Sequence, residues 1–217
     1  MDSSTDVDQL ARRLAPLSHG DDALVVLQEF LTGLGSWSER QKFLNTHLLC
    51  APIRYESVKP RLSADPGPFF GLQGDIIRTD AALSLGDRPR GASYAVATST
   101  CDLMPSYGRE TVLLLPVVPV AQGGSDEKLR RELGNLVSFR PKRYFYLPPL
   151  PDDGQDVLFN IVQLDPFAQA RKDDVAVAER RASMTLIGWR VFGALLRSLE
   201  VREGAGEIDI RRMGTES

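Results

Sequence analysis

The sequence predicts an α+β protein with a small antiparallel β-barrel at its centre. Helix-period apolar residues fill positions 1–50, short β-type runs dominate the middle of the chain, and a long apolar helical pattern occupies the end. With 217 residues, 42% of them hydrophobic and 25% charged, the chain is long enough to bury a sizeable core. Helices at both ends with consecutive strands between them indicate an α+β fold rather than an alternating α/β sheet.

The N-terminal residues 1–50 are expected to form a module of three amphipathic helices. Leu10 and Leu14 stand at helical spacing in the first of them. The segment Ser-Trp-Ser-Glu at residues 36–39 has the pattern of a capping box and should begin the third helix. A linker rich in Pro and Gly follows over residues 51–70, so the main domain is expected at residues 71–217.

The middle of the chain supplies the strands. Five runs rich in branched and aromatic residues are bounded by Gly, Pro or Asp, and are predicted as strands at residues 72–79, 93–101, 111–120, 143–147 and 157–164. A single inserted helix is expected at about residues 126–137, and an edge strand at 207–210. A long C-terminal helix is predicted at about residues 174–199, where apolar residues cover more than one face. Such a helix should be buried on both sides, by the sheet and by the N-terminal helices or a partner protein.

Composition and charge exclude several classes of protein. The formal net charge of -3 excludes a protein that binds polyanions over its whole surface, but leaves a local basic patch open. The longest apolar run, residues 112–121, contains two prolines and is about half the length that spans a bilayer. Residues 1–8 are polar and acidic, so no secretory signal is expected. Because Cys50 and Cys101 make no disulfide framework, we expect a reducing, cytoplasmic setting without membrane association.

Several short phrases resemble the MazF/PemK-like toxin family. They are Gly-Asp-Ile-Ile at residues 74–77, Arg-Pro at 88–89, Tyr-Ala-Val-Ala-Thr-Ser at 94–99, and the late strand at 156–165. The resemblance covers about residues 71–200 and implies an SH3-like barrel with a C-terminal helix. It also implies a ribonuclease that cuts single-stranded RNA without a metal or another cofactor.

The resemblance further implies where a nuclease site would lie. The family uses an arginine in or near the Arg-Pro loop, for which Arg88 and Arg90 are the candidates here. It also uses a Ser or Thr at the end of the third strand, but this chain has no hydroxyl residue from Val112 to Val120. In a nuclease, one hydroxyl of the triplet Thr98, Ser99 and Thr100 would have to replace it.

A basic and aromatic segment is the candidate RNA-binding surface. Its residues are Arg140, Lys142, Arg143, Tyr144 and Tyr146. Arginine binds phosphate and tyrosine stacks on bases, so this composition suits single-stranded RNA. The favoured alternative is an ordinary amphipathic strand in which Phe145 faces the core and its neighbours face solvent.

Other polar residues have two interpretations each. Asp75, Arg78, Cys101 and Asp102 are candidates for a polar cleft with a thiol nucleophile; the favoured alternative is a buried small Cys101, with Asp102 capping a turn. The arginines at 180–181 are expected to form local ion pairs on a solvated helix face. Asp-Asp-Gly at 152–154 is expected to be a hairpin turn, with no metal loop.

These observations favour a catalytically degenerate, MazF-like module that binds another protein. The absent third-strand hydroxyl, the acidic net charge and the surplus of apolar helix surface support this hypothesis. The expected partner is a protease, a transcription factor or an antitoxin-like protein, bound through apolar helix faces in a prokaryotic defence or toxin–antitoxin-type system. A homodimer is a further expectation. The alternative is a metal-independent endoribonuclease that acts on single-stranded RNA.

Overall fold

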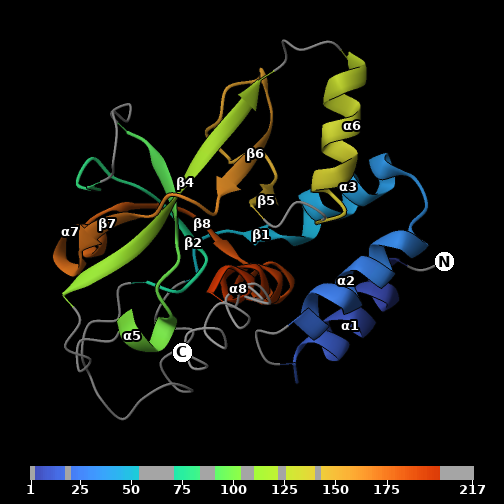
Figure 1. The fold of residues 1–217 in the computed structure, drawn as a ribbon, viewed down its shortest axis with the longest axis horizontal. Coiled ribbons are helices and arrows are strands. Elements are labelled where there is room, and N and C mark those ends of the chain that lie inside the picture. Colours follow the sequence, from blue (N-terminus) through green and yellow to red (C-terminus); the bar gives the residue numbers. More distant parts are fainter. Residues whose placement is uncertain are drawn as a thin grey trace, which may run out of the picture.

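The structure is a computed structural model that confirms the α+β class. It describes residues 3–17, 21–53, 71–83, 91–103, 110–121, 126–139 and 143–200. Most of the predicted linker and the predicted edge strand at 207–210 lie outside these ranges. The described part consists of N-terminal helices, a curled antiparallel sheet that forms a half-barrel, and a C-terminal helix (Figure 1).

The N-terminal helices are α1 (Ser3–Leu14), α2 (Asp21–Gly33) and α3 (Trp37–His47). The predicted capping box is present: Ser36 Oγ accepts the Glu39 amide, and the Glu39 carboxylate accepts the Ser36 amide at 3.0 Å. These two bonds satisfy amides at the start of α3 that no helical carbonyl can reach. Directly after α3, β1 (Leu49–Cys50) joins the sheet.

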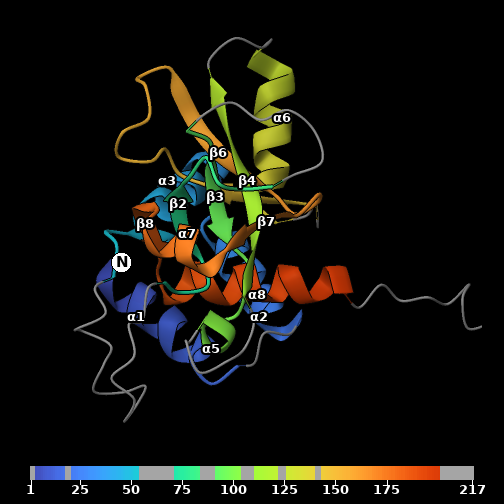
Figure 2. The ribbon, with the colours of Figure 1, turned by 90° about the vertical axis from the view of Figure 1, so that its left-hand side faces the viewer.

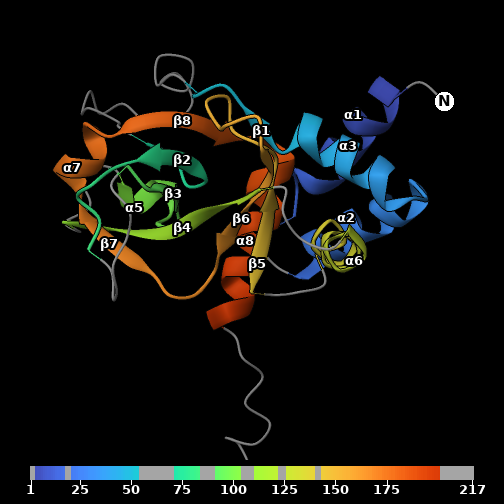
Figure 3. The ribbon, with the colours of Figure 1, turned by 90° about the horizontal axis from the view of Figure 1, so that it is seen from above.

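All strand pairs of the sheet are antiparallel, in the order β1-β8-β2-β3-β4-β6-β5. The remaining strands are β2 (Asp75–Arg78), β3 (Ser93–Val96), β4 (Thr111–Ala121), β5 (Tyr144–Leu147), β6 (Val157–Gln163), β7 (Ala168–Arg171) and β8 (Glu179–Met184). Seen from above, the strands curl around a common centre (Figure 3). The predicted helix between the third and fourth predicted strands is α6 (Asp126–Leu136).

Strand β4 is the longest strand and has two partners along one edge. Its first half, residues 111–114, pairs with β7, whereas its second half, residues 117–121, pairs with β6. On the other edge it pairs with β3. The chain therefore bends between Leu164 and Ala168 to run first along one half of β4 and then along the other.

The predicted long helix at residues 174–199 is wrong in its first half. This part of the chain forms a short helix, α7 (Lys172–Ala176), and then β8; α8 (Leu186–Glu200) begins only at Leu186. Because β8 is hydrogen-bonded between β1 and β2, tertiary pairing overrides a pattern that is equally compatible with a helix. Ala182, Ser183 and Met184 are all buried, since both faces of this strand are covered.

The predicted strand at residues 93–101 is also too long. Strand β3 ends at Val96, and residues 100–103 form a helical turn, α5 (Thr100–Leu103). The oxygen of Ser99 accepts the Asp102 amide at 3.3 Å, a local bond that competes with extended backbone.

The sheet has a hydrophobic core on each face. Alternation along β2 places Ile76 in the core shared with the helices and Ile77 in a smaller core covered by α5, α7 and β7. The larger core also contains Leu14 of α1 and Leu27 of α2, and both helices contact α8. Figure 2 shows α8 running below the strands beside α1 and α2. The apolar faces of these helices are thus buried within the chain.

Candidate functional site

Two hollows lie beside residues that the sequence analysis identified. The first is a cavity of about 320 Å³ among β3, β4, β6 and β8. Its lining residues are Arg78, Gly91, Ala92, Ser93, Val117, Val118, Pro119, Asp153, Asn160 and Arg181. The second is an open groove of about 750 Å³ between α5 and α8.

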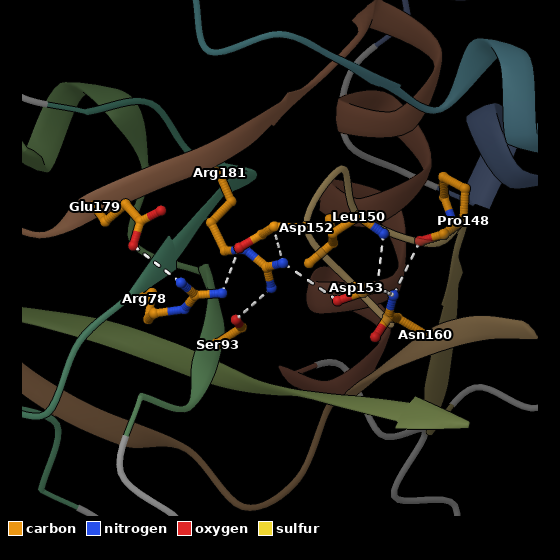
Figure 4. Close-up of polar contacts among 9 residues, drawn as sticks. All are labelled: Arg78, Ser93, Pro148, Leu150, Asp152, Asp153, Asn160, Glu179 and Arg181. Atoms are coloured by element: carbon orange, nitrogen blue, oxygen red, sulfur yellow. Dashed lines mark hydrogen bonds and ion pairs between the residues drawn. The ribbon is translucent and has the colours of Figure 1, made fainter. Parts of the chain in front are cut away.

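Two arginine side chains beside the first cavity bind carboxylates (Figure 4). Arg78, at the end of β2, binds Asp152 and also Glu179, with Nη1 3.1 Å from the Glu179 Oε2. Arg181, on β8, binds Asp152 and also Asp153, with Nη2 3.2 Å from the Asp153 Oδ1. Asp152 therefore bridges two guanidinium groups, and each guanidinium has a second carboxylate partner.

Arg181 is the most buried member of this cluster. Its side chain is 5% exposed, and its Nη1 donates to Ser93 Oγ at 2.9 Å. Burial, together with the positive charge of Arg78, lowers the pKa of Arg181 to about 10, so the group stays protonated at neutral pH. The predicted local ion pairs at residues 180–181 are wrong, because Arg181 reaches the hairpin between β5 and β6 and Arg180 binds the buried Asp75.

Asp153 fixes the hairpin from which these carboxylates project. Its Oδ2 accepts the Leu150 amide at 2.7 Å and the Asn160 Nδ2 at 2.6 Å. The same Nδ2 donates to the Pro148 carbonyl at 3.1 Å. The hairpin turn predicted from Asp-Asp-Gly exists, but its carboxylates have long-range partners that the local sequence does not reveal.

Asp75 is a buried structural acid and not a cleft residue. Its Oδ1 accepts the Ser183 hydroxyl at 2.5 Å, and its Oδ2 accepts the Leu72 amide at 2.9 Å and Arg180 Nη1 at 3.1 Å. Burial raises the pKa of Asp75 despite these donors. The predicted polar cleft is therefore not assembled: Asp75 is buried, Arg78 lines the first cavity, and Cys101 and Asp102 line the second hollow.

The groove contains the hydroxyl triplet, but each hydroxyl oxygen already accepts a hydrogen bond from a backbone amide. Thr98 Oγ1 accepts the Leu113 amide at 2.7 Å, and Thr100 Oγ1 accepts the Gln73 amide at 3.0 Å. Ser99 Oγ likewise accepts the amide of Asp102. These bonds give the triplet a structural role at the junction between β3 and α5.

The remaining groove wall is apolar and aromatic. Leu113, Phe167, Trp189 and Leu196 line it, and Phe167 is 42% exposed. The Trp189 Nε1 donates to Gln73 Oε1 at 3.0 Å, which fixes the indole. Cys101 is exposed on this groove, so the favoured interpretation of a buried cysteine is wrong; the short α5 turns its side chain away from the core.

The candidate RNA-binding residues do not all face solvent. Phe145 and Tyr146 are fully buried, and the Tyr146 hydroxyl donates to Asn45 Oδ1 at 2.6 Å. Burial raises the pKa of Tyr146 to about 12. The prediction that Tyr146 contacts RNA is therefore wrong. Arg143 and Tyr144, by contrast, are exposed at the start of β5. The favoured alternative of an amphipathic strand is confirmed for Phe145, which is buried, and for Tyr144, which is exposed.

Four predicted site residues lie outside the described part of the chain. They are Arg88 and Arg90 of the nuclease hypothesis and Arg140 and Lys142 of the RNA surface. Within the described residues, no three His, Cys, Asp or Glu side chains are grouped so that they could hold a metal ion. None of the described helices combines the length and apolar character that crossing a membrane requires.

Comparison with known proteins gives distant structural similarity but no sequence match. No family model matches the chain, and no curated protein matches it. A solved structure described as "Endoribonuclease from Mycobacterial species" superimposes with a TM-score of 0.33 and 13% sequence identity. The alignment covers 60% of this chain and 92% of that chain. At this score and identity, the similarity assigns neither a family nor an activity to the chain.

Proposed function

We propose that this chain is a non-catalytic, MazF-like half-barrel that acts by binding a partner protein. The observation that carries the proposal is the carboxylate pairing of Arg78, Arg180 and Arg181. A site that cleaves RNA needs positive charge directed at the phosphate, where negative charge develops in the transition state. Among the described residues, these three guanidinium groups are already committed to carboxylates.

The hydroxyl triplet supports the same proposal. A catalytic hydroxyl needs a proton acceptor beside it. Among the described residues that line the groove, Asp102 is the acidic one, and its backbone amide donates to Ser99 Oγ. The oxygens of Thr98, Ser99 and Thr100 instead accept backbone amides. With this role, the triplet shapes the groove and does not perform chemistry in it.

The groove between α5 and α8 is the surface that we assign to the partner. The apolar faces of α1 and α2 are buried against α8, so they are not free for this purpose. The groove joins an exposed aromatic ring and aliphatic side chains to polar groups of residues 98–102. That mixture suits an extended peptide segment of a protein in a defence or toxin–antitoxin-type system, whose apolar side chains pack while its backbone forms hydrogen bonds.

The test is co-expression with the products of neighbouring genes, followed by size-exclusion chromatography and titration calorimetry of any complex. Phe167→Ala should weaken the complex at least about tenfold, since a truncated aromatic anchor typically costs more than 1 kcal/mol. Tyr144→Ala is the matched control, because Tyr144 is an aromatic residue of nearly equal exposure, 40% against 42%, and does not line the groove. Equal binding by both variants and the parent would contradict the assignment of the groove.

A metal-independent endoribonuclease is the second candidate function. It is favoured by the clustering of three hydroxyl groups, Cys101 and Arg197 on one groove of sufficient size for nucleotides. Purified protein should be incubated with single-stranded RNA in excess chelator, beside Arg88→Ala and Arg90→Ala. Cleavage that falls about 10²–10³-fold in one variant would establish this function and exclude the non-catalytic proposal. Equal cleavage by all three proteins would indicate a contaminating nuclease.

A further inference from the structure

The hairpin loop at residues 150–154 connects two distant parts of the sheet. It joins β5 to β6, whereas its carboxylates bind Arg181 on β8 and Arg78 on β2. In the sheet order, β8 and β6 are separated by β2, β3 and β4. These ion pairs therefore do not follow the hydrogen-bond ladder; they join the loop directly to Arg78 and Arg181, as Figure 4 shows.

The two carboxylates of the loop are held very differently. The Asp153 side chain is 10% exposed and is fixed by Leu150, Asn160 and Arg181. The Asp152 side chain is 43% exposed, and its partners in the described structure are the two guanidinium groups. A partly exposed ion pair such as that of Asp152 with Arg78 contributes little free energy and is screened by salt. Asp152 is thus the more weakly held of the two carboxylates, and its release should let the loop open more often.

The cavity of about 320 Å³ lies beside this contact. Asp153, Asn160 and Arg181 line it together with Ser93 and the apolar segment 117–119. When the loop is closed, Asp152 occupies the guanidinium groups that border the cavity. Release of Asp152 would leave Arg78 with Glu179 and Arg181 with Asp153 as their carboxylate partners.

We propose that the loop at residues 150–154 is a salt-sensitive ionic latch that holds the β5–β6 hairpin against β2 and β8 beside this cavity. Asp152 is the releasing part of the latch, Arg78 and Arg181 are its receptors, and Asp153 is the more firmly held carboxylate of the loop. Glu179 also binds Arg78, but it lies on the neighbouring strand β8 and pairs with Arg78 in the sheet register, so it does not hold the loop. This inference is independent of the proposed partner groove between α5 and α8.

The test is hydrogen exchange of the full-length chain, followed at the amides that the loop protects. The Leu150 amide donates to the Asp153 side chain, and the amides of Asp153 and Val157 donate to the Leu150 and Gly154 carbonyls. Asp152→Asn should speed exchange at these amides about threefold to tenfold, the factor expected for losing two partly exposed ion pairs. Glu179→Gln is the matched control: it removes a carboxylate from the same Arg78 and should leave exchange in the loop unchanged.

Salt provides the second readout. Raising sodium chloride from 0.05 M to 1 M should speed exchange of the loop amides in the parent and in Glu179→Gln, but not in Asp152→Asn. The Ala97 amide, which donates to the Leu113 carbonyl, is the reference for global opening. Equal exchange in Asp152→Asn and the parent, or acceleration of the Ala97 amide by the same factor as the loop, would overturn the latch.

Discussion

At Tyr146, an aromatic ring lies fully inside the protein while its hydroxyl reaches Asn45 on α3. The ring stacks against Phe159 of β6, with centroids 5.7 Å apart. Tyr144, at the start of β5, is exposed. Phe145 is buried against Phe192 of α8, and Tyr146 is buried beside α3 and β6. The sequence shows that aromatic residues lie on this strand. It does not show that Tyr144 meets solvent while Tyr146 is buried.

Tyr146→Phe tests the buried hydroxyl. The substitution keeps the ring and removes one hydrogen bond, so the free energy of unfolding should fall by about 1 kcal/mol. Urea denaturation followed by circular dichroism would measure it. If single-stranded RNA binds at all, its affinity should not change in this variant; a weakened gel shift would place Tyr146 at an RNA surface and contradict its burial.

The buried Asp75 makes stability depend on pH in a defined direction. Because burial raises its pKa, the folded protein binds this proton more tightly than the unfolded chain does. The contribution of Asp75 is therefore fully present below the ordinary pKa of an aspartate and is lost as the pH rises through the raised value. In Asp75→Asn, this pH-dependent contribution to the free energy of unfolding is absent.

The expected observation is that the difference in unfolding free energy between the parent and Asp75→Asn narrows as the pH increases. Urea denaturation of both proteins at a series of pH values would measure this difference. Other titrating groups cancel in it, since both proteins share them. A difference that widens with pH would mean that pairing with Arg180 outweighs the burial of the carboxyl group.

At the scale of elements, α8 packs unusually close to the segment between α3 and β1. A Cβ atom added at Gly188 would collide with the Leu48 carbonyl oxygen. Thr185, just before α8, donates its hydroxyl to the His47 carbonyl at 2.5 Å and accepts the Gly188 amide at 3.2 Å. The start of α8 is therefore fixed to the end of α3 through backbone contacts that allow no side chain between them.

Gly188→Ala should destabilise the protein by about 1–3 kcal/mol, because backbone must move to admit the methyl group. Gly134→Ala is the matched control: Gly134 lies within α6 with no atom within 4 Å of an added Cβ, so alanine should stabilise by up to about 1 kcal/mol. Thermal denaturation of the two variants gives the comparison. A Gly188→Ala protein as stable as the parent would show that α8 can shift away from Leu48.

The periodic elements could be predicted from the sequence, and the elements set by tertiary pairing could not. Strands β4, β5 and β6 and helix α6 lie within one residue of their predicted ranges at each end, because their apolar patterns are strong and their boundaries carry Gly, Pro or Asp. Strand β8 was missed because its neighbours β1 and β2 are distant in sequence. The ion pair of Arg181 and Asp152 could not be predicted for the same reason, because only the curl of the sheet brings the two residues together.

At the scale of the whole molecule, the N-terminal helices and the sheet share one hydrophobic core. Leu14 and Leu27 belong to the same buried cluster as Phe145 of β5 and Phe192 of α8. Arg190 of α8 donates to the carbonyl of Ala15, at the end of α1, at 2.7 Å. We therefore expect the helices and the sheet to unfold as one cooperative unit.

Leu27→Ala tests this cooperativity. The residue is fully buried in α2, so the substitution should cost about 2–5 kcal/mol of unfolding free energy. The two tryptophans report on different regions, with Trp37 in α3 and Trp189 in α8. In single-tryptophan versions made with Trp→Phe, the urea midpoint should fall by the same amount at both probes. A shift confined to Trp37 would show that the helices unfold separately.

The position of β8 also affects how the protein is made. Leu49 and Cys50 pair with Met184 and Ser183, so the first strand of the sheet has no partner until the ribosome has synthesised β8. The helices that precede β1 meet α8 later still. During synthesis, the apolar faces of α1 and α2 are therefore exposed to solvent or bound by a chaperone until α8 emerges, and the sheet is completed only after β8 has been made.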